Sequence, residues 1–258
     1  MWVALAVSCH SRRASPPRCH VVIEDVITQP LPATLMFDGG RLVLPHECDL
    51  NELATLFTAC FYDGMGPEVP PYALEELRRS VPPEMARASP REQEHWRTTA
   101  AGLRSRIGMR LRCPTLAPST TNSLVVALAE RCRLVACCEL SIRPPHGLLP
   151  GRPAQRRLAA SPALLTSPPL VAYCSSLGVE ASLRGRGVGR RMLRACEWLV
   201  AREWGMTELH LHVDQDNVAA AALYHAMGYD PLPAFDNVCA EPGKSFRYSS
   251  KRLVVDGA

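Results

Sequence analysis

Hydrophobic residues recur along this chain with two different periods, and the two periods separate strands from helices. Short β-branched and aliphatic runs predict strands and one hairpin with a polar turn at Glu130–Arg133. The predicted strands cover 41–45, 123–143 as the hairpin, 171–179, 208–213, 229–232 and 245–255. Apolar residues spaced three and four apart predict helices over 49–61, 71–80, 89–108, 188–205 and 217–228.

Polar residues at the helix starts support these boundaries. Asp49 can cap the first helix, and Glu52 follows it at the spacing of a capping box. Ser89 can cap the third helix, with Pro90 in its first turn and Glu92 completing a second box. The strands and helices alternate in the second half of the chain. We therefore expect an α/β fold, a mixed sheet with at least one parallel pair of strands.

Composition bounds the number of domains. The 258 residues, 47% of them hydrophobic, are enough for one core, and we expect a single domain over 39–255. Residues 144–170 hold seven prolines and no acid, which predicts an insert between strands. The first 23 residues contain arginine and serine but no acid, so 1–38 is expected to be a leader of the organelle transit type. The alternative is a disordered tail.

Charge and cysteine usage narrow the possible partners. A net charge of +4 does not argue for nucleic-acid binding, and no apolar run is long enough to span a membrane. The eleven cysteines are odd in number and form no CxxC pair. We therefore expect no disulfide framework and no metal site, but small buried hydrophobic residues in a reducing compartment.

The stretch "RGRGVGRRML", residues 184–193, carries the first candidate chemistry. It follows a predicted strand and opens a predicted helix, where free backbone N–H groups and the positive end of the helix dipole favour an anion. Glycines allow a ligand to approach the backbone closely. Arg184, Arg186 and Arg190 add positive charge.

Two common phosphate motifs do not fit this stretch. A dinucleotide fingerprint would need glycine where Arg190 stands, and the Walker A pattern is absent. The pattern that remains is R-x-x-G-x-G, formed by Arg184, Gly187 and Gly189. Taken alone, that pattern also describes a solvated basic turn.

A second motif follows downstream in the order expected of one family. The strand "LHLHV" precedes Asn217 and the run "NxxAxxLYxxxGY", which ends at Tyr229. Together with the turn at 184–189, this arrangement resembles the GNAT superfamily of acetyl-CoA-dependent N-acetyltransferases. It is most similar to plastid GNAT enzymes and to bacterial ribosomal-protein N-terminal acetyltransferases. The resemblance implies the GNAT (acyl-CoA N-acyltransferase) fold, in which two parallel strands splay apart and helices flank the sheet.

The resemblance also implies which residues bind acetyl-CoA. The backbone of Leu177, Gly178 and Val179 would pair with the pantetheine arm. The turn would hold the pyrophosphate, and Asn217 and Tyr224 would contact the pantetheine and the thioester sulfur. The turn residues concerned are Arg184, Gly185, Arg186, Gly187, Val188, Gly189 and Arg190.

Two residues are expected to carry the catalytic chemistry. Tyr224 matches the tyrosine that acts as general acid toward the leaving thiolate, and the Val179 N–H would stabilise the oxyanion. His212 stands where the bacterial enzymes carry a glutamate base, and an ordinary histidine, with a pKa of ~6.5, can take a proton near neutral pH. A merely packed strand histidine is the alternative. Glu139 and Glu180 are further candidates for the base.

The expected activity is transfer of an acetyl group from acetyl-CoA to a protein amine, either an N-terminal α-amine or a lysine ε-amine. The alternatives are acetylation of a small-molecule amine and a non-catalytic acyl-CoA-binding module. The expected partners are acetyl-CoA and a protein or peptide, with no nucleic acid, no membrane and no metal. The family resemblance and the leader favour the plastid over the mitochondrion or the cytoplasm, and the sequence does not predict an oligomeric state.

Overall fold

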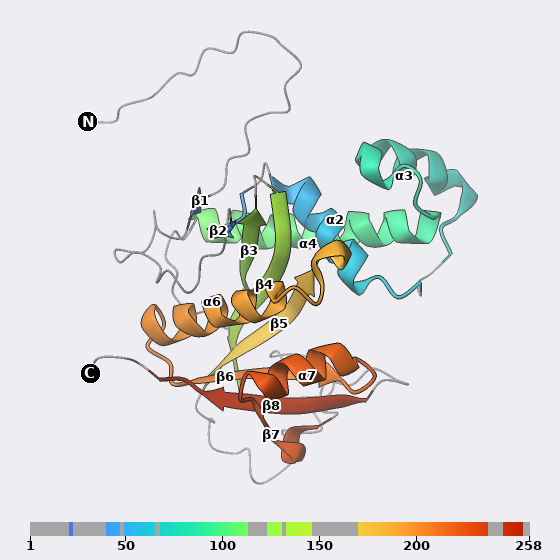
Figure 1. Cartoon of the computed structure of the whole chain (residues 1–258). Coiled ribbons are helices and arrows are strands. Elements are labelled where there is room, and N and C mark those ends of the chain that lie inside the picture. Colours follow the sequence, from blue (N-terminus) through green and yellow to red (C-terminus); the bar gives the residue numbers. More distant parts are fainter. Residues whose placement is uncertain are drawn as a thin grey trace, which may run out of the picture.

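One mixed β-sheet organises the molecule. The computed structural model describes residues 21–22, 40–46, 49–64, 68–112, 123–130, 133–145, 170–236 and 245–254. In this part of the chain eight strands form one sheet in the order β1-β2-β3-β4-β5-β6-β8-β7 (Figure 1). Their bounds are β1 Val21–Val22, β2 Gly40–Leu44, β3 Leu124–Glu130, β4 Arg133–Arg143, β5 Val171–Val179, β6 Glu208–Asp214, β7 Asp230–Pro231 and β8 Phe246–Arg252.

Only β5 and β6 run parallel among the described strands, and every other pair is antiparallel. The α6 helix (Val188–Arg202) connects the two, as expected for a parallel crossover. The predicted mixed α/β sheet is therefore confirmed.

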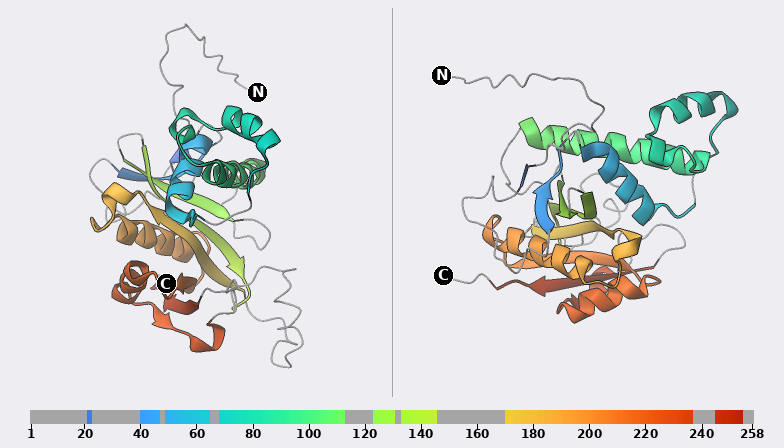
Figure 2. Two further views of the ribbon diagram at one scale, coloured as in Figure 1. Left: turned by 90° about the vertical axis from the view of Figure 1, so that its right-hand side faces the viewer. Right: turned by 45° about the horizontal axis from the view of Figure 1, so that its top comes forward.

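Helices cover both faces of the sheet. On one face lie α2 (Leu50–Phe61) and α4 (Pro90–Arg112), with the short α3 (Leu74–Ser80) beside α4. On the other face lie α6 and α7 (Val218–Ala226). Figure 2 shows the two helical layers on opposite sides of the strands. Short 3-10 turns occur at Pro71–Ala73, Pro83–Met85, Ala181–Leu183 and Pro233–Phe235.

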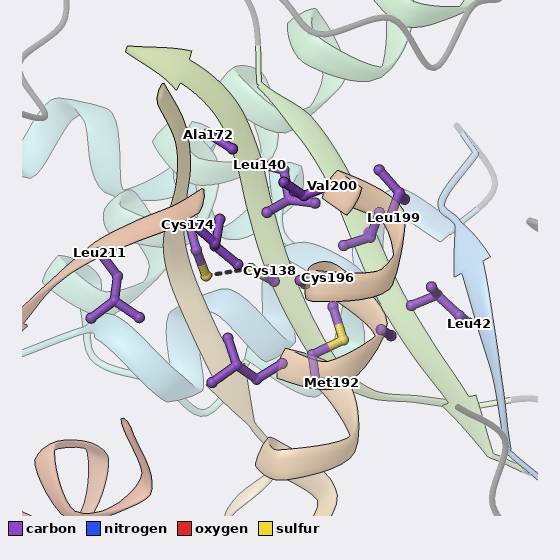
Figure 3. Close-up of a cluster of buried hydrophobic side chains, with 14 of the residues drawn as sticks. Leu42, Cys138, Leu140, Ala172, Cys174, Met192, Cys196, Leu199, Val200 and Leu211 are labelled. Atoms are coloured by element: carbon purple, nitrogen blue, oxygen red, sulfur yellow. Dashed lines mark hydrogen bonds between the residues drawn. The ribbon is translucent and has the colours of Figure 1, made fainter. Parts of the chain in front are cut away.

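Two apolar cores result, because successive strand residues point to opposite faces. Cys137 packs in the core under α2 and α4, whereas its neighbour Cys138 packs in the core under α6. In that second core the Sγ atoms of Cys138 and Cys174 lie 3.2 Å apart, beside Cys196 (Figure 3). One apolar face of α6 is buried here, formed by Val188, Met192, Ala195, Cys196 and Leu199. The five described cysteines, Cys60, Cys137, Cys138, Cys174 and Cys196, are free thiols.

The predicted caps divide into two groups. The Ser89 hydroxyl accepts a hydrogen bond from the Glu92 N–H, as expected. The prediction of a capping box at the start of α2 is wrong. Asp49 stands at the N-cap without a side-chain cap bond, and its carboxylate accepts the His46 N–H instead. The Glu52 carboxylate accepts the Leu134 N–H of β4, so a contact with the sheet replaces the local box.

Two predicted regions are described only at their margins. Within the expected leader, Val21 and Val22 pair antiparallel with Leu44 and Val43 of β2. Most of the proline-rich insert lies outside the described residues. Within the described chain, no helix is long and apolar enough to cross a membrane. The same residues contain no group of three potential metal ligands.

Candidate active site

The parallel strands β5 and β6 separate partway along their length. Their pairing runs from Ala172 opposite Leu209 to Cys174 opposite Leu211 and ends there. Both strands continue beyond this point, to Val179 and Asp214 respectively. Among the described residues, no strand pairs with this edge of the rest of β5, which leaves backbone groups there for a ligand.

A β-bulge begins where the strands separate. In the pairing of β5 with β4, Glu139 lies opposite Ser175 but Cys137 lies opposite Gly178, so β5 contains one extra residue. Ser176, inside this bulge, has φ = 55° and is the one described non-glycine residue with positive φ. Such a conformation costs about 1–3 kcal/mol and is found mostly where function requires it.

The register beyond the bulge decides which peptide groups face the opening. The Glu180 N–H donates to the Val135 carbonyl, so this pair faces inward between β5 and β4. Hydrogen-bonded and non-hydrogen-bonded pairs alternate in an antiparallel ladder. Gly178 therefore also faces β4, whereas the peptide groups of Val179, and by the same alternation Leu177, face the opening. Two of the three residues predicted to pair with pantetheine thus direct their backbone groups into the opening.

Side chains from two other elements meet the Val179 carbonyl. It accepts hydrogen bonds from Arg184 Nε at 3.1 Å and from the Cys60 thiol at 3.5 Å. Burial raises the pKa of the Cys60 thiol, and the nearby Arg184 guanidinium partly offsets this rise. The end of β5 is therefore linked to both α2 and the arginine–glycine turn.

Gly178 is needed for close packing, since its peptide groups face β4 and not the opening. A Cβ added there would lie 2.9 Å from the Cys60 Sγ and 3.2 Å from the Cys137 Sγ. Glycine inside a strand often marks such a close approach. Cys60 was not predicted as a site residue, and this strand glycine was the sequence signal that something lies against β5.

The turn before α6 takes the form expected of an anion site. Gly185 and Gly187 have φ of 75° and 81°, in the left-handed region that favours glycine. Gly187 is the N-cap of α6, and the Arg191 N–H is bonded to its carbonyl, so the N–H groups of Val188, Gly189 and Arg190 come before the first helical bond. Arg186 and Arg190 are exposed.

Gly189 joins three parts of the site. A Cβ at this position would lie 3.3 Å from Leu223 of α7 and 3.6 Å from Val179 of β5. The start of α6, the end of β5 and the middle of α7 therefore touch at one point. Tyr224 follows Leu223, so the predicted turn, edge strand and tyrosine are brought together.

Tyr224 lies in the core under α6 and α7, with its ring 5.9 Å from that of Tyr229. Burial raises its pKa well above the usual value, and the thiols of Cys174 and Cys138 add to the rise. Cys174 belongs to the last paired position of β5 and β6, which puts Tyr224 where the strands separate. The phenol is protonated at neutral pH and can donate a hydrogen bond.

Asn217 starts the helix that carries Tyr224. Its Oδ1 accepts the Ala220 N–H, so Asn217 is the N-cap of α7. Its own N–H donates to the Asp214 carbonyl. In the described structure Asn217 thus fixes the join between β6 and α7, about two turns before Tyr224.

His212 lies on the opposite face of the sheet from Tyr224, in a cluster with Tyr173, Phe235, Phe246 and Tyr248. Its Nδ1 is 2.8 Å from the Tyr173 hydroxyl and its Nε2 is 3.4 Å from the Phe235 carbonyl oxygen. Burial lowers its pKa to about 4, and the positive charge of Arg143 contributes to the shift. An α-ammonium group, with a pKa of ~8, is therefore a much weaker acid than protonated His212.

The two further candidate bases lie in different surroundings. Glu139 of β4 is nearly buried, at 8% exposure, and its Oε1 is 3.1 Å from Arg106 Nη2 of α4. Glu180 follows β5, and its carboxylate receives a hydrogen bond from Ser182 and lies 3.8 Å from Arg133. Glu139 is therefore paired with α4 on one face of the sheet, whereas Glu180 lies at the surface beside the turn.

The family follows from comparison with known proteins. A model of the acetyltransferase (GNAT) family matches residues 84–229, more than half of the chain. The chain belongs to this GNAT family. The match includes the bulged strand β5, the turn before α6 and Tyr224, so the predicted family is confirmed.

Curated relatives agree over shorter regions. GCN5-related N-acetyltransferase 7, chloroplastic, of Arabidopsis thaliana is 36% identical over 80 residues, 31% of this chain and 27% of that protein. The N-alpha-acetyltransferase RimI of Mycobacterium tuberculosis is 40% identical over 63 residues, 24% of this chain and 37% of that protein. Each match thus spans less than two fifths of the relative's own length.

A solved structure supports the GNAT fold. RimL, a ribosomal L7/L12 α-N-protein acetyltransferase in complex with coenzyme A, aligns with a TM-score of 0.50 and 13% identity. The alignment covers 85% of this chain and 97% of that one. The two chains therefore share a fold, and together with the family match this confirms the predicted fold class.

Proposed function

We propose that this GNAT protein transfers the acetyl group of acetyl-CoA to a protein amine, either an N-terminal α-amine or a lysine ε-amine. The contact of Gly189 with both Val179 and Leu223 carries the proposal. It joins a helix start suited to an anion, a strand edge with no described strand partner and a protonated tyrosine within one site. An acyl-CoA substrate presents the matching groups: a pyrophosphate, an extended amide arm and a thioester.

The residues that would hold acetyl-CoA follow from this arrangement. Val188, Gly189 and Arg190 offer N–H groups to the pyrophosphate, with charge from Arg186 and the open turn at Gly185 and Gly187. Leu177 and Val179 offer edge peptide groups to the pantetheine arm. Gly178 shapes that strand, and Asn217 positions α7. Arg184 already bonds the Val179 carbonyl, so it would share or release that bond when the arm binds.

The reaction needs few groups from the protein. A neutral amine attacks the acetyl carbonyl, the Val179 N–H stabilises the oxyanion, and the carbon–sulfur bond then breaks. Tyr224 donates its hydroxyl proton to the departing thiolate. Burial suits this role, because it keeps the tyrosine protonated until negative charge develops on the sulfur.

Relatives support a protein acceptor and the plastid. The name of the matched RimI specifies α-amine acetylation, and the matched plant GNAT proteins are named chloroplastic. These names support our proposal that the acceptor is a protein or peptide amine and that the protein acts in the plastid.

The proposal is tested with acetyl-CoA and a peptide library, read by mass spectrometry for α- and ε-acetylation. We expect acetylated peptides, and a Tyr224→Phe variant that turns over about 100-fold more slowly but still binds CoA. Turnover restricted to small amines would reassign the acceptor. Full turnover by Tyr224→Phe would remove the tyrosine from the mechanism.

A further inference from the structure

Two cysteine thiols from different elements come together over Gly178 of β5. Cys60 belongs to the last turn of α2, and Cys137 belongs to β4. A Cβ built on Gly178 would lie 2.9 Å from the Cys60 Sγ and 3.2 Å from the Cys137 Sγ, so both sulfurs lie next to one point. Glycine at this position therefore leaves no side chain between the two thiols.

These two thiols differ in their access to solvent. Cys60 is partly exposed, whereas Cys137 is fully buried. The three other described cysteines, Cys138, Cys174 and Cys196, are buried in the core under α6 (Figure 3). The sulfurs of Cys138 and Cys174 are only 3.2 Å apart, but that core shields both of them from a reagent in solvent. Among the described cysteines, Cys60 is therefore the one that a small dissolved oxidant meets first.

The surroundings of Cys60 decide how it reacts. Its Sγ lies 4.0 Å from Arg184 Nη2, and a guanidinium ion stabilises a thiolate. Burial nevertheless raises the pKa of this thiol, and it raises the pKa of Cys137 well above the usual value. An accessible cysteine beside a second cysteine is typical of thiols that oxidise reversibly. Because the pKa values are raised, little thiolate is present at neutral pH, and the oxidation should be slow and require excess oxidant.

We propose that Cys60 is an oxidation site, which hydrogen peroxide converts to a disulfide with Cys137. In the first step the Cys60 sulfur attacks one peroxide oxygen and becomes a sulfenic acid. The O–O bond breaks, and the hydroxide that leaves takes the Cys60 thiol proton as water. The Cys137 sulfur then attacks the oxidised sulfur, the S–S bond forms, and the second hydroxide leaves with the Cys137 proton. Both thiols are oxidised to one disulfide, and the peroxide is reduced to water.

Cys60 supplies most of the movement that this bond requires. The bonded sulfurs of a disulfide lie ~2 Å apart, so the two thiols must approach each other. Cys137 is held in the core under α2 and α4, whereas Cys60 lies one residue before the end of α2 at Phe61. Helix ends fray more readily than helix middles. Oxidation would therefore draw the last turn of α2 toward β4, over Gly178.

The disulfide would change the hydrogen bonds at Val179, where the pantetheine arm of acetyl-CoA would bind. In the reduced protein the Val179 carbonyl accepts from both the Cys60 thiol and Arg184 Nε. Arg184 can then turn toward a phosphate while the thiol still bonds the carbonyl. A disulfide has no thiol proton, so the carbonyl would depend on Arg184 alone. Oxidation should therefore weaken acetyl-CoA binding about 5-fold, the effect of one neutral hydrogen bond, an expectation that rests on the proposed function.

The first test treats the whole reduced chain with excess hydrogen peroxide, blocks the remaining thiols with iodoacetamide and maps disulfides by peptide mass spectrometry. We expect a peptide pair that joins Cys60 to Cys137 and that dithiothreitol separates. Cys60→Ser keeps a hydroxyl for the Val179 carbonyl but cannot form the bond, so it should give no such pair. A Cys138–Cys174 disulfide without the expected pair overturns the assignment. A Cys60 that stays reduced, or that bonds to any other cysteine, overturns it as well.

The second test measures binding by isothermal titration calorimetry, before peroxide treatment and after it, with the peroxide removed. Acetyl-CoA is the ligand, because it has no free thiol that could reduce the disulfide. We expect the Kd of the wild-type protein to rise about 5-fold and to return on reduction. Cys60→Ser and Cys137→Ala should each keep the same Kd through the treatment. Cys196→Ala leaves the pair intact and should respond like wild type.

The outcomes separate the disulfide from its effect and from the proposed function. Thermal unfolding without ligand shows which variants fold, and if Cys137→Ala does not fold, Cys60→Ser decides. A rise in Kd that persists in Cys60→Ser overturns the link between this pair and acetyl-CoA, as does a mapped disulfide with an unchanged Kd. Reduced wild-type protein that binds no acetyl-CoA overturns the proposed function, whereas the peptide map still decides whether the disulfide forms.

Discussion

At the scale of single residues, Gly178 shows how closely the site is packed. The Cys60 and Cys137 thiols lie where its side chain would be, at 2.9 Å and 3.2 Å from a built Cβ. Cys137 is fully buried and cannot move without displacing the core under α2. The position thus requires glycine for lack of space, although Gly185 and Gly187 require it for their backbone conformation.

We expect Gly178→Ala to lower the free energy of unfolding by about 1–3 kcal/mol, because the added methyl overpacks this region. Gly108→Ala is a suitable control. It lies inside α4 with open space around its Cβ, so alanine should stabilise the helix by about 0.5–1 kcal/mol. Urea unfolding monitored by circular dichroism measures both. If Gly178→Ala and wild type have the same free energy of unfolding, α2 can shift at little cost to make room for the added methyl group.

At the scale of elements, one histidine ties four segments together. His212 of β6 contacts Tyr173 of β5, Tyr248 of β8 and the turn at Pro233–Phe235. The Tyr248 hydroxyl in turn donates to the Pro145 carbonyl, just after β4. This cluster holds the strands together beyond the region that α2 and α4 cover.

The lowered pKa of His212 predicts a pH-dependent stability. The folded value is about 4, against ~6.5 when unfolded, so between these values the unfolded chain binds more protons. The contribution of His212 to the free energy of unfolding is fully present above pH 6.5. It is lost as pH falls toward 4, by at most about 3 kcal/mol. His210, whose pKa burial also lowers, acts in the same direction.

Urea unfolding of wild type and His212→Asn at several pH values between 4.5 and 7 measures this effect. The variant should be less stable at pH 7 and should lose less stability on acidification. The comparison uses the difference between the two proteins, because other groups titrate in both. If the free energies of unfolding of the two proteins fall equally as the pH is lowered, His212 is readily protonated in the folded protein.

The sequence predicted elements better than it predicted the relations between them. The 3.6-residue pattern located α2 and α6 well, since amphipathic faces are local. The roles of Asp49 and Glu52 were missed because their carboxylates bond to backbone N–H groups outside the helix. The bulge at Ser176 has no local signature, since serine does not favour positive φ. Without that register, the peptide groups of Val179 could not be assigned to the opening between β5 and β6.

At the scale of the whole molecule, one sheet serves two cores, and the proposed ligand would touch elements that belong to both. Val179 contacts Cys60 of α2 on one side and packs against Gly189 of α6 on the other. Binding at this junction should therefore stabilise the whole fold.

We expect CoA at one hundred times its Kd to raise the free energy of unfolding by about 2.7 kcal/mol, or Tm by about 5–10 °C. Gly187→Glu should lose this shift, because it puts a negative charge and a side chain at the N-cap of α6. Arg194→Gln changes the charge by the same amount on an exposed part of α6 and should keep the shift. Differential scanning fluorimetry with and without CoA distinguishes them. An unchanged shift in Gly187→Glu would exclude the turn as the binding site.

The bulge on β5 also sets the register of every residue beyond it. If β5 kept its length but continued in the register that it has before the bulge, Val179 would lie opposite Val135 and not Ala136. A shift of one residue moves every later side chain to the other face of the sheet. Val179 would then direct its N–H and carbonyl toward β4, and its side chain would leave Gly189 for the face under α2. The bulge thus decides whether the end of β5 pairs fully with β4 or offers the Val179 peptide groups to a ligand.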